Sequence, residues 1–374
     1  MAAANNVLIV GGGIAGMSLA ISLRRIGIAV ELVELDPDWR VSGAGITIIA
    51  PTLRAFDRLG IVDRIIDEGS CTDGLKMCDA RGRVMAELPT PSLAGPRVPG
   101  TGGILRPTLH RILSEATLAA GSKVRLGVTV GAMAQSDRHA HAAFTDGGGG
   151  DYDLIVGADG LFSALRRMIF PEAPAPHFTG QGCWRVVAPR PPEIAVAHMY
   201  MAGRVKAGVT PISRDEMYLF FLQHLPDNPR MPQERFHRIL AQQLAPFGGA
   251  VGVIRDALGP DSPINYRPLE AILLPPPWHR GRVVLIGDAV HGTTPHLAAG
   301  AGMAVEDALV LTDLLAESDA IETALNRFAE RRYPRAAMVV NNSLKLGEME
   351  MSEATFPDYA ALMGASMAAL AAPM

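Results

Sequence analysis

Short apolar runs separated by glycine-rich turns and helix-forming stretches dominate the first part of the chain. Residues 7–10, Val-Leu-Ile-Val, are typical of a strand buried on both faces of a parallel sheet. A glycine cluster follows, then helix formers over residues 18–25 and a second apolar run over residues 29–34. This order is a β-α-β unit, so the pattern predicts a parallel sheet from the start of the chain.

The same strand signature returns at residues 154–156 and 283–286. Between them, from about residue 171 to 277, prolines become frequent and the run 217–222 favours antiparallel strands. The fold class predicted is α/β. A Rossmann-type nucleotide-binding domain, with a parallel sheet and helices, is interrupted by a mostly antiparallel β-sheet domain and followed by C-terminal helices.

Helices are expected at residues 108–120, from about 302 to 315, and from 320 to 333. Pro334 is expected to interrupt the last of these, because proline has no backbone N–H. We expect three structural units. The expected units are a discontinuous nucleotide-binding domain (1–75, 101–172 and 279–345), a substrate-binding β domain (76–100 and 173–278) and a C-terminal helical tail (346–374).

Composition excludes several classes of protein. The formal net charge is −4, hydrophobic residues make up 48% and no basic stripe occurs, so nucleic acid is not expected as a partner. No apolar stretch reaches the roughly 20 residues of a membrane span. The three cysteines form no C-x-x-C pair, and no cluster has metal-ligand spacing, so neither a disulfide framework nor a metal is expected. A cytoplasmic location follows as an expectation.

The glycine cluster matches G-x-G-x-x-G, the dinucleotide fingerprint, at Gly11, Gly13 and Gly16. The first glycine permits the turn, the second lets a pyrophosphate approach the helix N-terminus, and the third allows close packing. Glu34 ends the second strand, where an acid can hold ribose hydroxyls. The fingerprint leaves NAD and FAD both open. The expected cofactor contacts of this unit are Gly11, Gly13, Ile14, Ala15, Gly16 and Glu34.

Two later segments carry a family resemblance. Residues 157–166 (GADGLFSALR) resemble the "DG" motif of group A FAD-dependent aromatic hydroxylases, which have the p-hydroxybenzoate hydroxylase fold. Residues 287–295 (GDAVHGTTP), continuing to 308, resemble the second FAD motif of that family, closest to its salicylate hydroxylase-like branch. The resemblance implies FAD as the bound cofactor.

The resemblance also implies roles for individual residues. Asp288 would hydrogen-bond the ribityl chain of the flavin, and the N–H groups that start the following helix would face its N1/C2=O edge. Asp159 would support cofactor binding, with a turn-forming role as the alternative. The further cofactor contacts implied are Arg40, Gly45, Arg106, Val130, Asp159, Gly287, Asp288, Gly300, Ala301, Gly302 and Met303.

The candidate residues on the substrate side are supported by fewer motifs than the cofactor contacts. Pro295 would lie beside the flavin ring, and His296 would reach flavin or substrate unless it is an exposed loop histidine. Tyr218 would line the pocket from an alternating strand, with Phe220 of the same strand and His198, Tyr200 or Met201 of another strand as the alternatives. A structural hydrogen bond is expected for His291. The dipeptide Trp184-Arg185 matches a common family element and is expected to be architectural.

The implied activity is that of an NAD(P)H-consuming monooxygenase. NAD(P)H would reduce FAD, O2 would add at flavin C4a, and the hydroperoxide would hydroxylate an electron-rich phenol or hydroxypyridine-like ring. The alternatives are a same-fold flavoenzyme acting on a non-aromatic substrate and a non-enzymatic flavin-binding module. A halogenase is disfavoured, because the three tryptophans cannot form that group's Trp-x-Trp-x-Ile-Pro signature. A monomer or a homodimer is expected.

Overall fold

A six-stranded sheet forms one end of the molecule in the computed structural model, which describes residues 2–41, 43–202, 205–352 and 356–374. The strand order is β18-β19-β12-β1-β2-β8, all parallel except the edge strand β18. This confirms the parallel sheet predicted from the apolar runs. The strands are β1 (Asn6–Val10), β2 (Ala29–Glu34), β8 (Lys123–Leu126), β12 (Leu154–Gly157), β18 (His279–Arg280) and β19 (Val283–Leu285).

Three helices form a layer that packs with this sheet. Helix α1 (Ile14–Arg25) lies against both α4 (Arg106–Ala119) and α9 (Gly300–Glu317). Residues 15–23 of α1 are all buried, because this helix has neighbours on nearly every side. Helix α9 is similarly enclosed and also contacts α2 (Ala50–Arg58). The layer therefore brings the glycine turn, which precedes α1, close to the start of α9.

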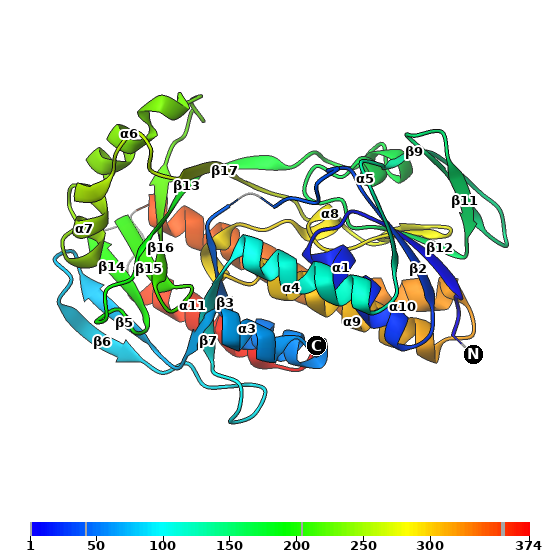
Figure 1. Ribbon diagram of the computed structural model, residues 1–374, viewed down its shortest axis with the longest axis horizontal. Coiled ribbons are helices and arrows are strands. Elements are labelled where there is room, and N and C mark those ends of the chain that lie inside the picture. Colours follow the sequence, from blue (N-terminus) through cyan, green and yellow to red (C-terminus); the bar gives the residue numbers. More distant parts are fainter. Residues whose placement is uncertain (1, 42, 203–204, 353–355) are drawn as a thin grey trace.

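A seven-stranded sheet forms the other end of the elongated molecule (Figure 1). Its order is β17-β13-β16-β15-β14-β5-β6, antiparallel throughout except for the parallel pair β14–β5. The antiparallel insertion predicted from the sequence is thus confirmed. The strands are β5 (Leu75–Asp79), β6 (Val84–Leu88), β13 (His177–Pro189), β14 (Ala197–Ala202), β15 (Val205–Pro211), β16 (Glu216–His224) and β17 (Ile264–Ala271).

The two faces of this sheet meet different partners. One face is buried in a core that Trp184 and Phe221 share with Phe247, next to helices α6 (Phe236–Gln243) and α7 (Gly249–Ala257). The other face turns toward the nucleotide-binding part. It meets the small sheet of β3 (Gly45–Ile49), β7 (Thr101–Leu105) and β4 (Ser70–Thr72). We call this second face the flavin-facing face, after the cofactor that the sequence resemblance implies for the nucleotide-binding part.

The remaining elements are short or peripheral. These elements are α3 (Val62–Glu68), β9 (Val130–Gln135), β10 (Ala140–Phe144), β11 (Gly149–Tyr152), α5 (Ala164–Ile169), η1 (Gln233–Arg235), α8 (Asp288–His291) and η2 (Pro295–Leu297). Strands β11, β10 and β9 form, in that order, a three-stranded sheet beside the parallel sheet.

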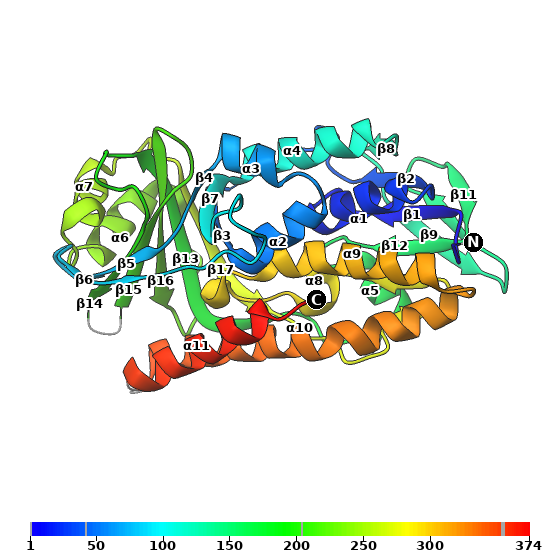
Figure 2. The ribbon, with the colours of Figure 1, turned by 90° about the horizontal axis from the view of Figure 1, so that it is seen from below.

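Helix α10 (Ile321–Met351) runs without interruption, so the predicted break at Pro334 was wrong. Proline removes one N–H from the helix, but tertiary contacts outweigh that loss here. Arg332 and Arg335, on either side of the proline, bind carboxylates of α9. Figure 2 shows α10 passing along one side of the molecule from the parallel sheet to the seven-stranded sheet.

Helix α11 (Phe356–Ala371) folds back along α10 (Figure 2). Its C-terminal carbonyls accept hydrogen bonds from Arg54 of α2 and Arg335 of α10. These contacts fix the tail to the nucleotide-binding part. None of the helices in the described part of the chain combines the length and apolarity that a membrane span requires.

Candidate flavin and substrate site

The glycine turn after β1 has the shape that its sequence predicts. Gly11 has φ of +109°, which favours glycine, and a Cβ on Gly16 would lie 2.0 Å from the Gly11 carbonyl oxygen. By contrast, a Cβ on Gly13 would meet no atom within 4 Å. Gly11 and Gly16 are therefore required by packing, whereas Gly13 leaves open space at the N-terminus of α1.

Glu34 supports this turn from the end of β2. One carboxylate oxygen accepts a hydrogen bond from the Gly12 N–H at 2.7 Å, and the other accepts one from the Asp36 N–H at 2.8 Å. The Trp39 indole donates to the Gly12 carbonyl at 2.9 Å. Glu34 thus lies next to the glycine turn, as the dinucleotide fingerprint requires. The predicted contact Val130 is buried at the start of β9.

Asp288 begins α8 just beyond the parallel strand β19. Gly287, with φ of +61°, makes the turn, and its N–H donates to the buried Asp307 carboxylate at 2.8 Å. Desolvation by the surrounding protein raises the pKa of the Asp288 carboxyl, and the opposing charges of His291 and Arg106 only partly offset this rise. The Asp288 carboxylate has no hydrogen-bond partner among the described residues, so it is available to a ligand at the carboxyl end of the sheet.

The two candidate arginines differ in their surroundings. Arg40 is 70% exposed and pairs with Asp36 and Asp38, so its charge is already balanced. Arg106 starts α4, and burial together with nearby Arg185 lowers the pKa of its guanidinium. Its guanidinium donates no hydrogen bond within the described part of the chain. Arg106 is therefore the better placed of the two to bind an anionic part of a cofactor.

The start of α9 approaches α2 very closely. A Cβ on Gly302 would lie 2.3 Å from the Thr52 hydroxyl, so only glycine fits there. Ala298, with φ of +50°, turns the chain into the helix. The first N–H groups of α9, at Gly300, Ala301 and Gly302, have no partner within the helix, and the positive end of its dipole lies there. Met303 is buried in the first turn.

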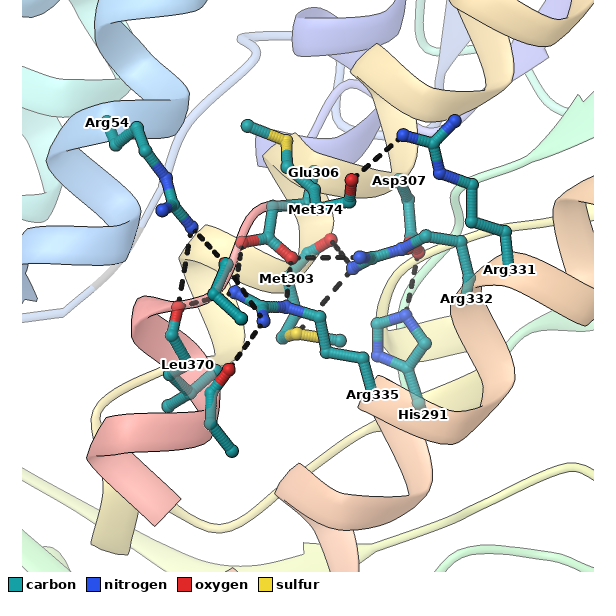
Figure 3. Close-up of polar contacts among 12 residues, drawn as sticks. Arg54, His291, Met303, Glu306, Asp307, Arg331, Arg332, Arg335, Leu370 and Met374 are labelled. Carbon is teal, nitrogen blue, oxygen red and sulfur yellow. Dashed lines mark hydrogen bonds and ion pairs between the residues drawn. The ribbon is translucent and has the colours of Figure 1, made fainter. Parts of the chain in front are cut away.

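A buried charge network fixes the second motif in place (Figure 3). Asp307 accepts hydrogen bonds from His291 at 2.7 Å and from Arg332 at 2.7 Å. Arg332 also binds Glu306, which makes two 2.8 Å contacts with Arg335. Burial raises the pKa of Asp307, but His291 and Arg332 outweigh it and lower that pKa to about 2. The structural role predicted for His291 is confirmed.

Asp159 of the DG motif makes a local contact. One of its oxygens accepts the N–H groups of Ala164 at 2.7 Å and Leu165 at 3.0 Å, which satisfies the start of α5. Its other oxygen is buried without a partner among the described residues. The turn-forming alternative is thus present in the structure, and the cofactor role stays a prediction.

Tyr218 lies on the flavin-facing face, between β16 and β3. Its hydroxyl is 2.5 Å from the Thr47 hydroxyl, and a Cβ on Gly45 would collide with its ring. Burial raises the pKa of the phenol. Gly45 is therefore explained by the packing of Tyr218 against it, and the tyrosine hydroxyl is held by Thr47.

The dipeptide Trp184-Arg185 divides between the two faces of the sheet. Trp184 is buried in the core beneath α6, so its expected architectural role is confirmed. Arg185 is the next residue on β13 and points to the flavin-facing face, opposite Phe220 of β16. Its charge acts on Arg106, at the start of α4, and on Tyr218 of the neighbouring strand β16. The architectural interpretation is therefore confirmed for Trp184, and for Arg185 it stays a prediction.

His296 is buried, so the alternative of an exposed loop histidine was wrong. It follows Pro295 in η2, and its Nδ1 lies 2.8 Å from the Thr294 hydroxyl. Its Nε2 is 3.4 Å from a carboxylate oxygen of Glu350 on α10. Burial lowers the pKa of the imidazole, although Glu350 opposes this. His296 also lines a cavity of about 220 Å³ between β13, η2 and α10.

Sequence reasoning missed the partner of His296. Glu350 accepts hydrogen bonds from Lys206 of β15 and from the Tyr359 hydroxyl at 2.9 Å. Burial raises the pKa of Glu350, but Lys206 and His296 outweigh it and lower that pKa to about 2. Lys206 and Glu350 are 144 positions apart, and no local pattern pairs them. A lysine inside an apolar strand was the one available signal.

Comparison with known proteins gives a consistent result. The family described as an FAD binding domain matches residues 4–343. The 2-heptyl-3-hydroxy-4(1H)-quinolone synthase of Pseudomonas aeruginosa is 33% identical over 350 residues, covering 92% of this chain and 89% of the relative. The aurachin C monooxygenase/isomerase of Stigmatella aurantiaca is 31% identical over 366 residues, covering 94% and 91%.

A solved structure shares the fold. The crystal structure of Klebsiella pneumoniae HpxO complexed with FAD and uric acid has a TM-score of 0.85 and 24% sequence identity. The match covers 96% of this chain and 92% of that one. The residues here suit FAD, because open space at Gly13 adjoins a helix N-terminus, while the charged groups of Asp288 and Arg106 make no hydrogen bond to any described residue. This chain belongs to the FAD-binding-domain family of flavoprotein monooxygenases, and its cofactor is FAD.

Proposed function

We propose that the protein hydroxylates a phenol or a hydroxypyridine-like ring, consuming NAD(P)H and O2. The observation that carries this proposal is the flavin-facing face itself. Arg185, Tyr218 and Phe220 line it opposite Asp288 and Arg106, so an aromatic ring could lie between the sheet and the flavin. Relatives named for quinolone and urate chemistry support a ring substrate.

FAD supplies the redox chemistry when it is bound: it takes hydride from NAD(P)H and activates O2. The chain's own residues bind and orient. Asp288 would accept hydrogen bonds from the polyol chain, and Arg106 would neutralise an anionic part of the cofactor. The N–H groups at Gly300 to Gly302 would stabilise negative charge on the reduced ring. These assignments follow the contacts that the structure leaves open.

The candidate catalytic residues take restricted roles in this proposal. Tyr218 acts as a hydrogen-bonding group rather than a base, because Thr47 holds its hydroxyl and burial raises its pKa. Pro295 would border the flavin ring. His296 would act from behind Pro295, since its ring is held by Thr294 and faces Glu350.

We also propose the domain division expected from the sequence, a monomer or homodimer in solution, and a cytoplasmic location. Pairing of β5 with β14 supports grouping residues 76–100 with the substrate-binding domain. Light scattering coupled to gel filtration would establish the oligomeric state, and a mass above a dimer would contradict this part.

A turnover experiment tests the function. Purified FAD-loaded enzyme is given NADH or NADPH with a panel of phenols and hydroxypyridines, and coenzyme oxidation and products are followed. We expect slow basal oxidation, strong stimulation by one ring class, and a product with one oxygen atom from isotopically labelled O2. If stimulated oxidation yields hydrogen peroxide with every ring compound tested and no hydroxylated product, the proposal fails.

A further inference from the structure

Three cationic side chains of the seven-stranded sheet lie on its flavin-facing face, but their surroundings differ. Lys206 extends from β15, Arg185 from β13 and Arg267 from β17, and the strand pairing places all three on the same side. A buried or half-buried cation is costly unless an anion or several acceptors balance it. What balances each of the three therefore indicates its role.

Lys206 is already neutralised. It is buried, with its Nζ bonded to the Glu350 carboxylate and 2.8 Å from the Tyr359 hydroxyl. Burial opposes its ionisation, but Glu350 outweighs this, and the pKa of the ammonium is raised. The pair is a closed unit with no net charge, so it offers little attraction to a charged ligand.

Arg185 is half-buried, and no carboxylate or carbonyl accepts a hydrogen bond from its guanidinium within the described residues. Another cation, Arg106, is close enough for the charge of Arg185 to lower its pKa, and the two repel each other. The acid on the opposite side, Asp288, interacts with Arg106. An anion bound beside Arg185 would relieve this repulsion and satisfy the planar donor group.

The groups around Arg185 suit an aromatic ring. Phe220 lies directly opposite it on β16, and Cys183, Leu222 and Leu269 form a small apolar cluster against Phe220. Gly208 on β15 leaves room for the Phe220 ring, since a Cβ there would be 2.3 Å from it. One cation at the edge of an apolar wall is the arrangement expected for a flat anion.

We propose that Arg185 binds an anionic oxygen carried by the aromatic substrate, a ring carboxylate or a phenolate, and so sets the substrate class of this enzyme. The inference rests on the proposed hydroxylase function, because it assigns the ring to that site.

Equilibrium binding to the FAD-loaded protein tests the proposal without turnover. The probes are matched pairs of similar shape: benzoate with benzamide, and 4-nitrophenolate with nitrobenzene. Binding is followed by the change in the flavin absorption spectrum and by calorimetry. Wild type is compared with Arg185→Met and with Arg267→Met. The second variant removes the same charge from the same face one strand away, where the side chain is exposed.

We expect wild type to prefer at least one anion over its neutral partner. Arg185→Met should weaken binding of that anion by about tenfold or more, with the neutral partner and the FAD content unchanged. Arg267→Met should change anion binding by less than about threefold. If Arg185→Met loses binding of benzoate, the anionic group of the substrate is a ring carboxylate; if it loses binding of 4-nitrophenolate, that group is a phenolate. Either result supports the proposal.

Three results would overturn it. One is a wild-type enzyme that prefers neither anion. Another is equal weakening by Arg185→Met and Arg267→Met, which would show a diffuse potential rather than a contact. The third is loss of FAD from Arg185→Met, which would assign the arginine to the cofactor. Because no step requires hydroxylation, failure here is distinguishable from failure of the proposed function.

Discussion

Two groups of charged residues in and around the second flavin motif differ in how their charges are satisfied. In the first group, Asp307, Glu306 and Arg332 are buried and bonded to one another. In the second group, the charged groups of Asp288 and Arg106 have no hydrogen-bond partners among the described residues. The first group holds the backbone in place, and the second is available to the cofactor.

The difference teaches how to separate structural from functional charges in this fold. Breaking a fully bonded buried network destabilises the folded protein, because each partner left behind stays buried without a compensating charge. A charge without a protein partner contributes little to folding, and its removal should instead be seen in ligand binding. Stability and FAD affinity therefore report on different residues, and each of the following substitutions tests that separation.

The largest effect is expected for Asp307→Ala. This change leaves the Gly287 N–H, His291 and one edge of Arg332 without their acceptor, and should lower the free energy of unfolding by about 3–5 kcal/mol. Chemical denaturation of the apoprotein measures it. The matched control is Asp313→Ala on the same helix, whose exposed pair with Arg58 should contribute less than about 1 kcal/mol. Equal losses of unfolding free energy in the two variants would show that the buried network does not stabilise the fold more than an exposed pair does.

Asp288→Ala should have the opposite profile. Loss of a charge-assisted hydrogen bond of about 1.5–3 kcal/mol should weaken FAD binding roughly tenfold to 150-fold, with apoprotein stability nearly unchanged. Asp159→Ala should instead destabilise the fold by about 1 kcal/mol, because two N–H groups of α5 lose their acceptor. Titration of apoprotein with FAD, together with thermal unfolding, compares the two. Unchanged FAD affinity in Asp288→Ala would contradict our assignment.

The glycine turn allows the same comparison at the level of the backbone. Gly13→Ala should leave the apoprotein as stable as wild type, since its Cβ meets nothing, but should lower FAD affinity several-fold. Gly16→Ala should destabilise the apoprotein, because its Cβ would collide with the Gly11 carbonyl. FAD retention after gel filtration and the melting temperature of each apoprotein separate the two effects. Destabilised Gly13→Ala apoprotein would show that this glycine too is a packing residue.

A smaller effect concerns pH and the pair Lys206–Glu350. The pKa of Glu350 falls from its ordinary value of 4.5 to about 2 in the folded protein, so its stabilisation is complete above 4.5. It is lost as pH falls toward 2. The stability difference between wild type and Glu350→Gln should therefore be constant from pH 7 to 5 and shrink below 4.5. Urea unfolding at several pH values measures this. Glu348→Gln, on the same helix, removes only an exposed pair with Lys345 and should show no such trend.

Local signals in the sequence predicted the backbone features of the two flavin motifs. Gly11, Gly13 and Gly16 act through backbone geometry within a few residues of one another, so their spacing carries the information. The same holds for Gly287 and Asp288, which follow a strand that is apolar on both faces. Parallel strands and the helix starts beyond them are properties of short segments, and for that reason they could be predicted.

The substrate side could not be predicted in the same way. His296 is buried because Gly347 of α10, which belongs to none of the motifs, lets the His296 ring approach that helix closely. The continuity of α10 through Pro334 depends on bonds between its arginines and α9. Strand alternation places Trp184 and Arg185 on opposite faces, but which face meets the nucleotide-binding part depends on how the sheet packs. These features depend on contacts between distant segments.

The distance along the chain between Lys206 and Glu350 has a consequence for biosynthesis. The ribosome makes every strand of the seven-stranded sheet before residue 350, so until then Lys206 cannot pair with Glu350. Because an unpaired ammonium is costly to bury, we expect the side of the sheet that carries Lys206 to stay hydrated until α10 packs against it. The C-terminal helices would then be the last part of the chain to cover that side.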